Sequence, residues 1–219
     1  MMAAPQLEIP KSLREFQARY PAQDFPKKTR LHAVGEEAKY IYLVVSGTVK
    51  ISKISYTKQP LLSLVHSGEL WAESLFVAGN SWSMSAETAT KARIHCFSVR
   101  EFRRISSRDV ELMSWVASKI VQRLLKMERR LELMHSYPVE QRLMLTLADL
   151  ASYHDGAGEK ASSIEIPLTQ GELASLVGAT RETTSTILNM FARKGWIQLR
   201  RGAMYIPSTE SLVKAAHAP

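Results

Sequence analysis

Cysteine is almost absent from this sequence. The 219 residues contain a single one, Cys96. One thiol can form neither an internal disulfide bond nor the all-cysteine sites that hold structural zinc or an iron–sulfur cluster. A single cysteine also fits a reducing compartment. The sequence therefore predicts a cytoplasmic protein with no metal site.

Long apolar runs are absent as well. No stretch of about 18 apolar residues occurs, so we expect no membrane span. Residues 1–10 lack the basic and apolar segments of a secretion signal. Nothing in the sequence therefore predicts a membrane partner.

Acidic residues are fewer than basic ones. The chain has 21 Asp and Glu against 29 Lys and Arg, which gives a formal net charge of +8. Such an excess favours a polyanionic partner, either nucleic acid or an anionic surface. Apolar residues make up 45% of the chain, enough for a folded core in one large domain or two small ones.

Short runs rich in β-branched and aromatic residues dominate the first part of the chain. They predict strands at residues 40–45, 48–54, 61–66 and 92–98. Gly35, Gly47 and Gly68 mark turns between them. Many short strands at regular spacing predict a β-sandwich or roll.

Residues 109–136 form one continuous helical pattern. Its apolar residues recur at alternating steps of three and four, a heptad-like seam made of Met113, Val116, Ile120, Leu124, Met127, Leu131 and Met134. The seam either packs on its own domain or faces the same helix of a second copy. Because one small β domain would hardly cover so long a stripe, we favour a homodimer.

Tyr137-Pro138 breaks this helix, since proline disfavours helical backbone at the residue before it. We therefore place a hinge here. The predicted domains are a sensor domain at 1–108, a dimerisation helix with its hinge at 109–137, and a C-terminal domain at 138–219. The last begins with a helix at 139–153.

The C-terminal domain contains a helix, a tight turn, a second helix and a β-hairpin. A capping box starts the first helix, because Thr169 and Glu172 can each satisfy a backbone N–H group of the other. Gly178 permits a left-handed turn, and Thr180 can cap a second helix that ends near Gly195. Strand patterns follow at residues 196–200 and 203–206. This order predicts a winged helix-turn-helix.

The second of these helices suits the major groove of DNA, with its first residues at the base edges. Arg181 can donate two hydrogen bonds to guanine, Glu182 can accept one from cytosine, and Thr186 can touch a thymine methyl or a phosphate. The helix starts and the basic hairpin suit phosphate oxygens. The predicted phosphate contacts come from Thr169, Gln170, Thr180, Thr183, Ser185, Arg200 and Arg201.

A winged domain can also mediate protein contacts, in which case Arg181 and Glu182 are only a solvated helix start. The capping box, the glycine turn, the exposed threonines and the basic hairpin together favour DNA.

The stretch LTQGELASLVGATRETTSTILNMFARKGWI, residues 168–197, resembles the helix-turn-helix signature of the cyclic-AMP receptor protein/FNR family. Residues 35–51, GEEAKYIYLVVSGTVKI, resemble the entry to the family's β-roll, and residues 68–70 and 72–76 resemble its effector-phosphate loop. The resemblance spans residues 35–206. It implies an α+β fold: an N-terminal β-roll (a jelly roll of the cyclic-nucleotide-binding type), a long dimerisation helix and a C-terminal winged helix-turn-helix. It also implies a homodimer that binds two-fold symmetric DNA and works with RNA polymerase.

The effector pocket departs from the family pattern. By resemblance the pocket consists of Glu73, Ser74, Trp82, Ser83, Met127 and Glu128. Trp82 replaces the family's phosphate-binding arginine, and a neutral indole cannot supply the donors of a guanidinium. Met127 and Glu128 replace the polar pair that meets the base. We therefore predict that cyclic AMP is not the effector, which is either another small molecule or none. Thr186 replaces a second DNA-reading arginine, so we expect a different half-site.

Other family sensors use an iron–sulfur cluster or haem. The single cysteine excludes the cluster. Haem ligands are available in His32, His66, His95 and Cys96, but the strand pattern around His95 favours a structural role, so we expect no haem.

Two other kinds of function compete with transcription regulation. A small-molecule binding module acting without DNA would leave the recognition helix and hairpin without a role. An enzyme would need a catalytic motif, and the sequence shows no Ser-His-Asp arrangement, paired-carboxylate pattern or Walker-type loop. We therefore predict a regulator. An effector would alter the packing of the dimer helices, and the hinge would set the spacing of the recognition helices at about 34 Å, one DNA turn.

Overall fold

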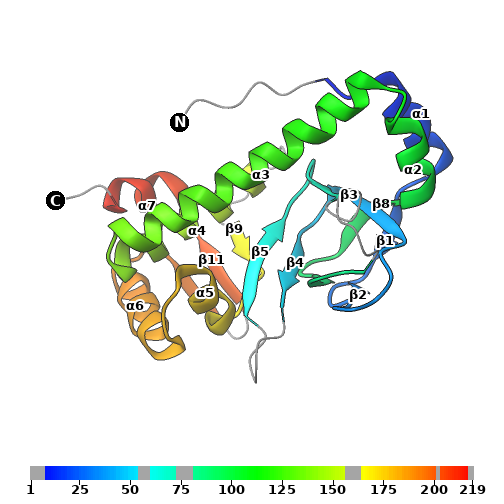
Figure 1. The fold of residues 1–219 in the computed structure, drawn as a ribbon. Helices are drawn as coiled ribbons and strands as arrows, with labels where there is room; N and C mark the ends of the chain where they lie inside the picture. Colours follow the sequence, from blue (N-terminus) through cyan, green and yellow to red (C-terminus); the bar gives the residue numbers. More distant parts are fainter. Residues whose placement is uncertain (1–7, 54–59, 73–80, 156–163, 201–202, 217–219) are drawn as a thin grey trace. The chain divides into compact units, whose positions relative to one another are not determined.

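The computed structural model describes residues 8–53, 60–72, 81–155, 164–200 and 203–216 (Figure 1). The chain packs as two compact units. The first consists of Met1–Gln59 with Ser63–Glu128, and the second of Pro60–Leu62 with Arg129–Pro219. The two units divide inside a long helix, after Glu128. The domain boundary at residue 137 stays a prediction from the sequence.

The first unit is built mainly of short antiparallel strands. Two four-stranded sheets have the orders β1-β8-β3-β6 and β2-β7-β4-β5. The strands are β1 (Gln23–Phe25), β2 (Arg30–His32), β3 (Tyr40–Ser46), β4 (Val49–Ser52), β5 (Leu61–Val65), β6 (Leu70–Trp71), β7 (Ser85–Thr88) and β8 (Ala92–Ser98). The first two residues of β5, Leu61 and Leu62, are counted with the second unit. The helices are α1 (Lys11–Arg19), α2 (Val99–Ser106) and most of α3 (Val110–Ser136).

Strand β3 is buried on both faces, which explains its continuous apolar run. Tyr42 and Val44 belong to a core that also contains Ile51 of β4 and Ala86 of β7, so this core lies between the two sheets. Ile41 and Leu43 alternate with them and belong to a second core with residues of α1, α2 and α3. The first sheet thus carries the sandwich core on one face and helices on the other.

The first half of α3 is part of this helical layer. Leu112, Trp115 and Val116 are buried in the second core, and Ile120 packs against it. The prediction that Val116 belongs to an outward seam is therefore wrong: its side chain is 0% exposed within its own chain. Sequence periodicity finds apolar positions but does not distinguish the chain's own core from a partner.

Further along α3 the predicted seam is open. Leu124, Met127 and Leu131 are 52%, 53% and 56% exposed, and Val121 beside them is also exposed. Large apolar side chains in a row on a helix surface mark an interaction face. This part of the seam stays a prediction of the dimer contact.

The second unit consists of helices and a small sheet, coloured from green at the end of α3 through yellow and orange to red at the C-terminus in Figure 1. Its helices are α4 (Val139–Asp155), α5 (Gln170–Val177), α6 (Arg181–Arg193) and α7 (Thr209–Ala216), joined by the end of α3. Strands β9 (Ile164–Ile166), β10 (Gln198–Arg200) and β11 (Ala203–Ile206) form an antiparallel sheet in the order β10-β11-β9. Helix α4 packs against α5, α7 and β9. In the described residues, no helix is both long and apolar enough to cross a membrane.

The elements foreseen from the sequence are present with small changes at their ends. The predicted strand at 48–54 is found as Val49–Ser52, that at 61–66 ends at Val65, and the helix at 139–153 continues to Asp155. The strand expected to start at Trp196 begins at Gln198, because the Trp196 N–H donates to the Phe191 carbonyl and Gly195 has a φ of +75° at the end of α6. The short strands β1, β2, β6, β7 and β9 and the helices α1, α2 and α7 were not foreseen.

Gly47 lies at the turn between β3 and β4. Its φ is +86°, and a Cβ atom there would lie 2.4 Å from the Lys91 carbonyl oxygen. Gly35 has a similar φ of +83°, but no atom lies within 4 Å of its Cβ position. Both glycines have the left-handed backbone that favours glycine. Of the two, only Gly47 also lacks room for a side chain.

We expect Gly35→Ala to lower the free energy of unfolding by about 1–2 kcal/mol, the cost of left-handed backbone. Gly47→Ala should lower it by about 2 kcal/mol more, because the backbone must move to admit the methyl group. Urea unfolding of both variants measures the difference. Equal losses would contradict the close approach at Gly47.

Candidate nucleic-acid interface and sensor pocket

The start of α5 is fixed by a complete capping box. The Glu172 N–H donates to Thr169 Oγ1 at 3.2 Å, and the Thr169 N–H donates to Glu172 Oε2 at 2.7 Å. Gly178 ends the helix in the left-handed conformation, with φ +63°. These local rules place α5 and the turn as the sequence predicts.

Helix α6 begins one residue after Thr180, whose Oγ1 accepts a hydrogen bond from the Thr183 N–H at 3.1 Å. Leu188 and Phe191 bury one side of the helix. The predicted base-reading residues Arg181, Glu182 and Thr186 are all exposed, as is Thr183, while Ser185 is half-buried. The first turns of α6 thus present polar side chains to solvent.

The wing brings a further cation to this region. Arg200 lies on β10, and its guanidinium lies 4.8 Å from the centroid of the Tyr205 ring on β11. A cation over an aromatic face is attracted by the ring, so Tyr205 helps to hold Arg200 in place. Arg201, the other predicted contact of the hairpin, lies outside the described residues.

A hollow of about 560 Å³ lies between the start of α5, the start of α6 and the wing. It is lined by Leu168, Thr169, Gln170, Gly171, Arg181, Arg200 and Met204. The structure thus brings the N-terminus of α5 together with one arginine of α6 and one of the wing. A helix start and two guanidinium groups are the kinds of group that attract an anion. Thr180, Thr183 and Ser185 lie at the start of α6 and do not line this hollow.

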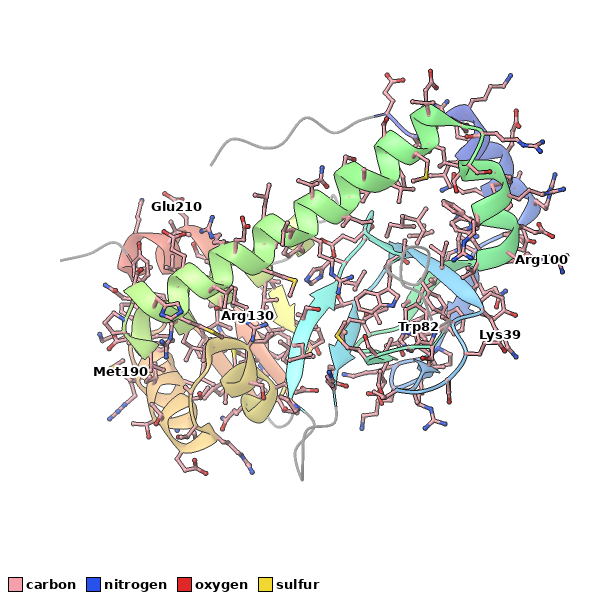
Figure 2. All side chains as sticks on the ribbon, viewed as in Figure 1. Lys39, Trp82, Arg100, Arg130, Met190 and Glu210 are labelled. Carbon is pink, nitrogen blue, oxygen red and sulfur yellow. The ribbon has the colours of Figure 1, made fainter. Side chains whose placement is uncertain are left out.

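In the first unit, Trp82 lies among the strands (Figure 2). It is only 5% exposed and stacks on His32, with the ring centroids 3.8 Å apart and the planes 11° apart. Trp71 and Tyr42 are close on other sides, at 5.9 and 6.0 Å between centroids. An aromatic cluster of His32, Tyr42, Trp71 and Trp82 therefore fills this part of the sandwich.

The other described residues of the predicted pocket differ from Trp82 in exposure. Ser83 is exposed, and Met127 and Glu128 are exposed on α3. Glu73 and Ser74 lie outside the described residues. The pocket that the resemblance implies is therefore only partly visible.

Sequence reasoning missed the cation next to the aromatic cluster. Arg123 of α3 places its guanidinium 3.8 Å from the centroid of Trp71, and its Nη2 donates to Ser63 Oγ at 3.3 Å. No motif pointed to this residue, because its partners come from β5 and β6, distant in sequence. The Arg123 guanidinium therefore already has partners within the protein, the Trp71 ring and the Ser63 hydroxyl.

The residues considered as haem ligands make protein contacts. His32 stacks in the aromatic cluster, and the His66 ring is 3.3 Å from the Thr48 hydroxyl. His95 Nδ1 donates to the Tyr20 carbonyl at 2.6 Å. Cys96 is half-buried, and burial raises the pKa of its thiol to about 11. These contacts account for the residues as parts of the fold.

Comparisons with known proteins match both units. Residues 22–109 match the cyclic nucleotide-binding domain, and residues 118–215 match the Crp-like helix-turn-helix domain. A CRP-like cAMP-activated global transcriptional regulator of Mycobacterium tuberculosis (strain H37Rv) is 32% identical over 205 residues, 88% of this chain and 87% of the relative. The chain belongs to the CRP/FNR family. It is a DNA-binding transcription regulator, and the resemblance seen in its sequence is confirmed.

Other regulators are similar to this CRP/FNR regulator in sequence or in fold. The cAMP-activated global transcriptional regulator CRP of Haemophilus influenzae is 29% identical, covering 78% of this chain and 75% of the relative. Two solved structures share the fold, each covering 90% of this chain and 98% of the other. They are the c-di-GMP responsive regulator CLP of Xanthomonas campestris (TM-score 0.73, 21% identity) and a CRP/FNR-family regulator of Thermus thermophilus (TM-score 0.72, 24% identity).

Burial of His32 makes the stability of this CRP/FNR regulator depend on pH. Burial lowers the pKa of His32 from 6.5 to about 4, and the Met84 backbone and Glu36 oppose this shift only in part. Between these pH values the unfolded chain binds a proton that the folded chain does not. The contribution of neutral His32 is therefore complete above pH 6.5 and is lost as the pH falls toward 4.

We expect up to about 3 kcal/mol of unfolding free energy to be lost through this group over that range. His32→Phe keeps a stacked ring but does not titrate, so its stability should fall less between pH 6.5 and 4. Denaturant unfolding at several pH values compares the two proteins. Parallel curves would show that His32 is not held neutral by the fold.

Proposed function

We propose that two copies of this chain bind a two-fold symmetric DNA site, each through its α5, α6 and wing. The observation that carries this proposal is the hollow at the start of α5, which Thr169, Gln170 and Gly171 line together with Arg181 and Arg200. Phosphate oxygens fit such a site.

In this proposal the first turns of α6 read base edges in the major groove. Arg181 donates to guanine O6 and N7, and Glu182 accepts from a cytosine amino group. The Thr186 hydroxyl donates to the Glu182 carbonyl at 3.0 Å, so its proton is engaged within the helix. This contact favours the thymine methyl, rather than a phosphate, as the partner of Thr186.

The flanking contacts hold the backbone of the DNA. Thr169, Gln170 and Arg200 line the hollow and suit one phosphate group. Thr180, Thr183, Ser185 and Arg201 complete the proposed phosphate set. Contacts of this kind fix the register of the protein on the duplex, while base contacts give the specificity.

The second copy packs, in this proposal, on the exposed apolar face of α3. Leu124, Met127 and Leu131 are each about half exposed, although they are large and apolar. A parallel pair of α3 helices buries them and gives the dimer the two-fold axis of the site. We place this regulator in the cytoplasm, with RNA polymerase as its further partner and no catalytic role.

We further propose that cyclic AMP is not the effector. The described residues of the sensor unit do not fit its phosphate, because the family's arginine is replaced by Trp82, which is buried against His32. Arg123, the cation next to the aromatic cluster, already stacks on Trp71. The effector is thus another small molecule, or the protein binds DNA without one.

Selection of binding sites from random duplexes, with and without cyclic AMP, tests both proposals. We expect a symmetric site with half-sites about one DNA turn apart, enriched equally in both selections. Enrichment only with cyclic AMP, or micromolar binding of cyclic AMP by calorimetry, would overturn the effector proposal and leave the DNA proposal standing. Enrichment of sites without two-fold symmetry would contradict the dimer.

The base-reading role of Arg181 has its own test. Arg181→Ala should weaken binding to the selected site by about 1–3 kcal/mol and relax specificity at one base pair, because a bidentate contact is lost. Arg104→Ala is the matched control, since it removes the same charge from an exposed position on α2. If Arg181→Ala and Arg104→Ala bind alike with unchanged sequence preference, α6 is not the reading helix.

A further inference from the structure

The last two turns of α3 belong to the second unit, together with α5 and α6. Arg130, labelled in Figure 2, is the residue that joins them. Its Nε donates to the Leu176 carbonyl at 2.6 Å and its Nη2 to the Ser175 carbonyl at 2.9 Å. Its Nη1 donates to the Leu62 carbonyl, in the same unit. One guanidinium thus holds three backbone carbonyl groups.

Two of these carbonyls come from the end of α5, where backbone oxygens lack partners within the helix. A cation at a helix C-terminus also interacts favourably with the helix dipole. The planar guanidinium reaches several acceptors at once with fixed geometry, which the single ammonium of lysine does not match. The contact is therefore specific to arginine.

Two further contacts bind the end of α3 to the same place. The Met134 side chain lies against the turn between α5 and α6, where its Cε is 3.3 Å from the Cβ position of Gly178. Arg142 of α4 donates to the Met134 carbonyl at 2.9 Å and to the Gly178 carbonyl at 3.4 Å. The end of α3, the start of α4 and the turn of the helix-turn-helix therefore form one packed body.

We propose that Arg130 is a positioning residue for DNA recognition. Its contacts join residues 129–136 of α3 to α5 and α6 as one body, which we call the reading head. Helices α5 and α6 therefore follow any movement of this end of α3 directly. The joint between sensor and reading head then lies within α3 near Glu128, where the two units divide, and not at Tyr137-Pro138. This inference rests on the proposed binding of a dimer to two half-sites.

Adjacent residues of α3 make the proposed dimer contact and the contact with α5. Leu131 is exposed on the proposed dimer face, and Arg130, its neighbour, is turned to α5. Successive residues of a helix point about 100° apart, so adjacent positions serve the two contacts. The packing of the two α3 helices then sets the spacing of the two reading heads.

The test compares DNA binding by Arg130→Gln, Arg130→Lys and the wild type. Arg129→Gln is the matched control, because it removes the same charge one residue away, where the Arg129 guanidinium makes a partly exposed 3.9 Å pair with Asp149 of α4. The duplexes carry the selected site, the same half-sites with about two base pairs added or removed between them, or a single half-site.

We expect Arg130→Gln to bind the selected site about tenfold more weakly and to lose most of its preference for one half-site spacing. Without the Arg130 contacts, the distance between the two α6 helices of the dimer is no longer fixed. Half-site affinity should stay within about twofold, and the salt dependence should not change, because Arg130 contacts carbonyls and no phosphate. Arg130→Lys should not restore the spacing preference, and Arg129→Gln should behave like the wild type.

An equal loss on half-sites and full sites would reduce Arg130 to a structural role and overturn the proposal, as would unchanged spacing preference. If the wild type binds none of the duplexes, the proposed DNA function fails, and amide hydrogen exchange decides the inference separately. Exchange should then speed up in Arg130→Gln at the ends of both α3 and α5, and unchanged exchange at these ends would overturn it.

Discussion

Helix α3 buries Leu112, Trp115 and Val116 against the first sheet and leaves a second apolar face open further along. The rest of the molecule depends on this division of one helix between two kinds of contact. The buried part fixes the direction of α3 relative to the β-roll, because a close-packed core admits one arrangement. The open part carries Leu124 and Leu131, the face on which we place the second copy.

The reading head depends on polar groups at helix ends as much as on its core. Thr169 and Thr180 satisfy N–H groups at the starts of α5 and α6, and Arg130 and Arg142 hold carbonyls at the ends of α5 and α3. Groups of this kind are costly when left unsatisfied. The start of α5, closed by its capping box, is also the place where we propose a phosphate contact.

The sensor unit contains an aromatic side chain where the sequence resemblance leads one to expect a cation. Trp82 replaces the arginine that the family uses for a phosphate, and it stacks on His32 within a filled aromatic cluster. Burial keeps His32 neutral, so the cluster contains no cation of its own. The β-roll is the scaffold against which the first half of α3 packs, and its other core contains the aromatic cluster.

Strong local signals were enough to predict the long helix, the capping box at Thr169, the glycine turn at Gly178 and the exposed residues at the start of α6. These follow from periodicity and from contacts between residues three or four apart. Three other features come from the folded chain: Val116 faces its own core, Trp82 stacks on His32, and Arg130 binds the end of α5. Those contacts join residues far apart in the chain, and local patterns carry no information about them.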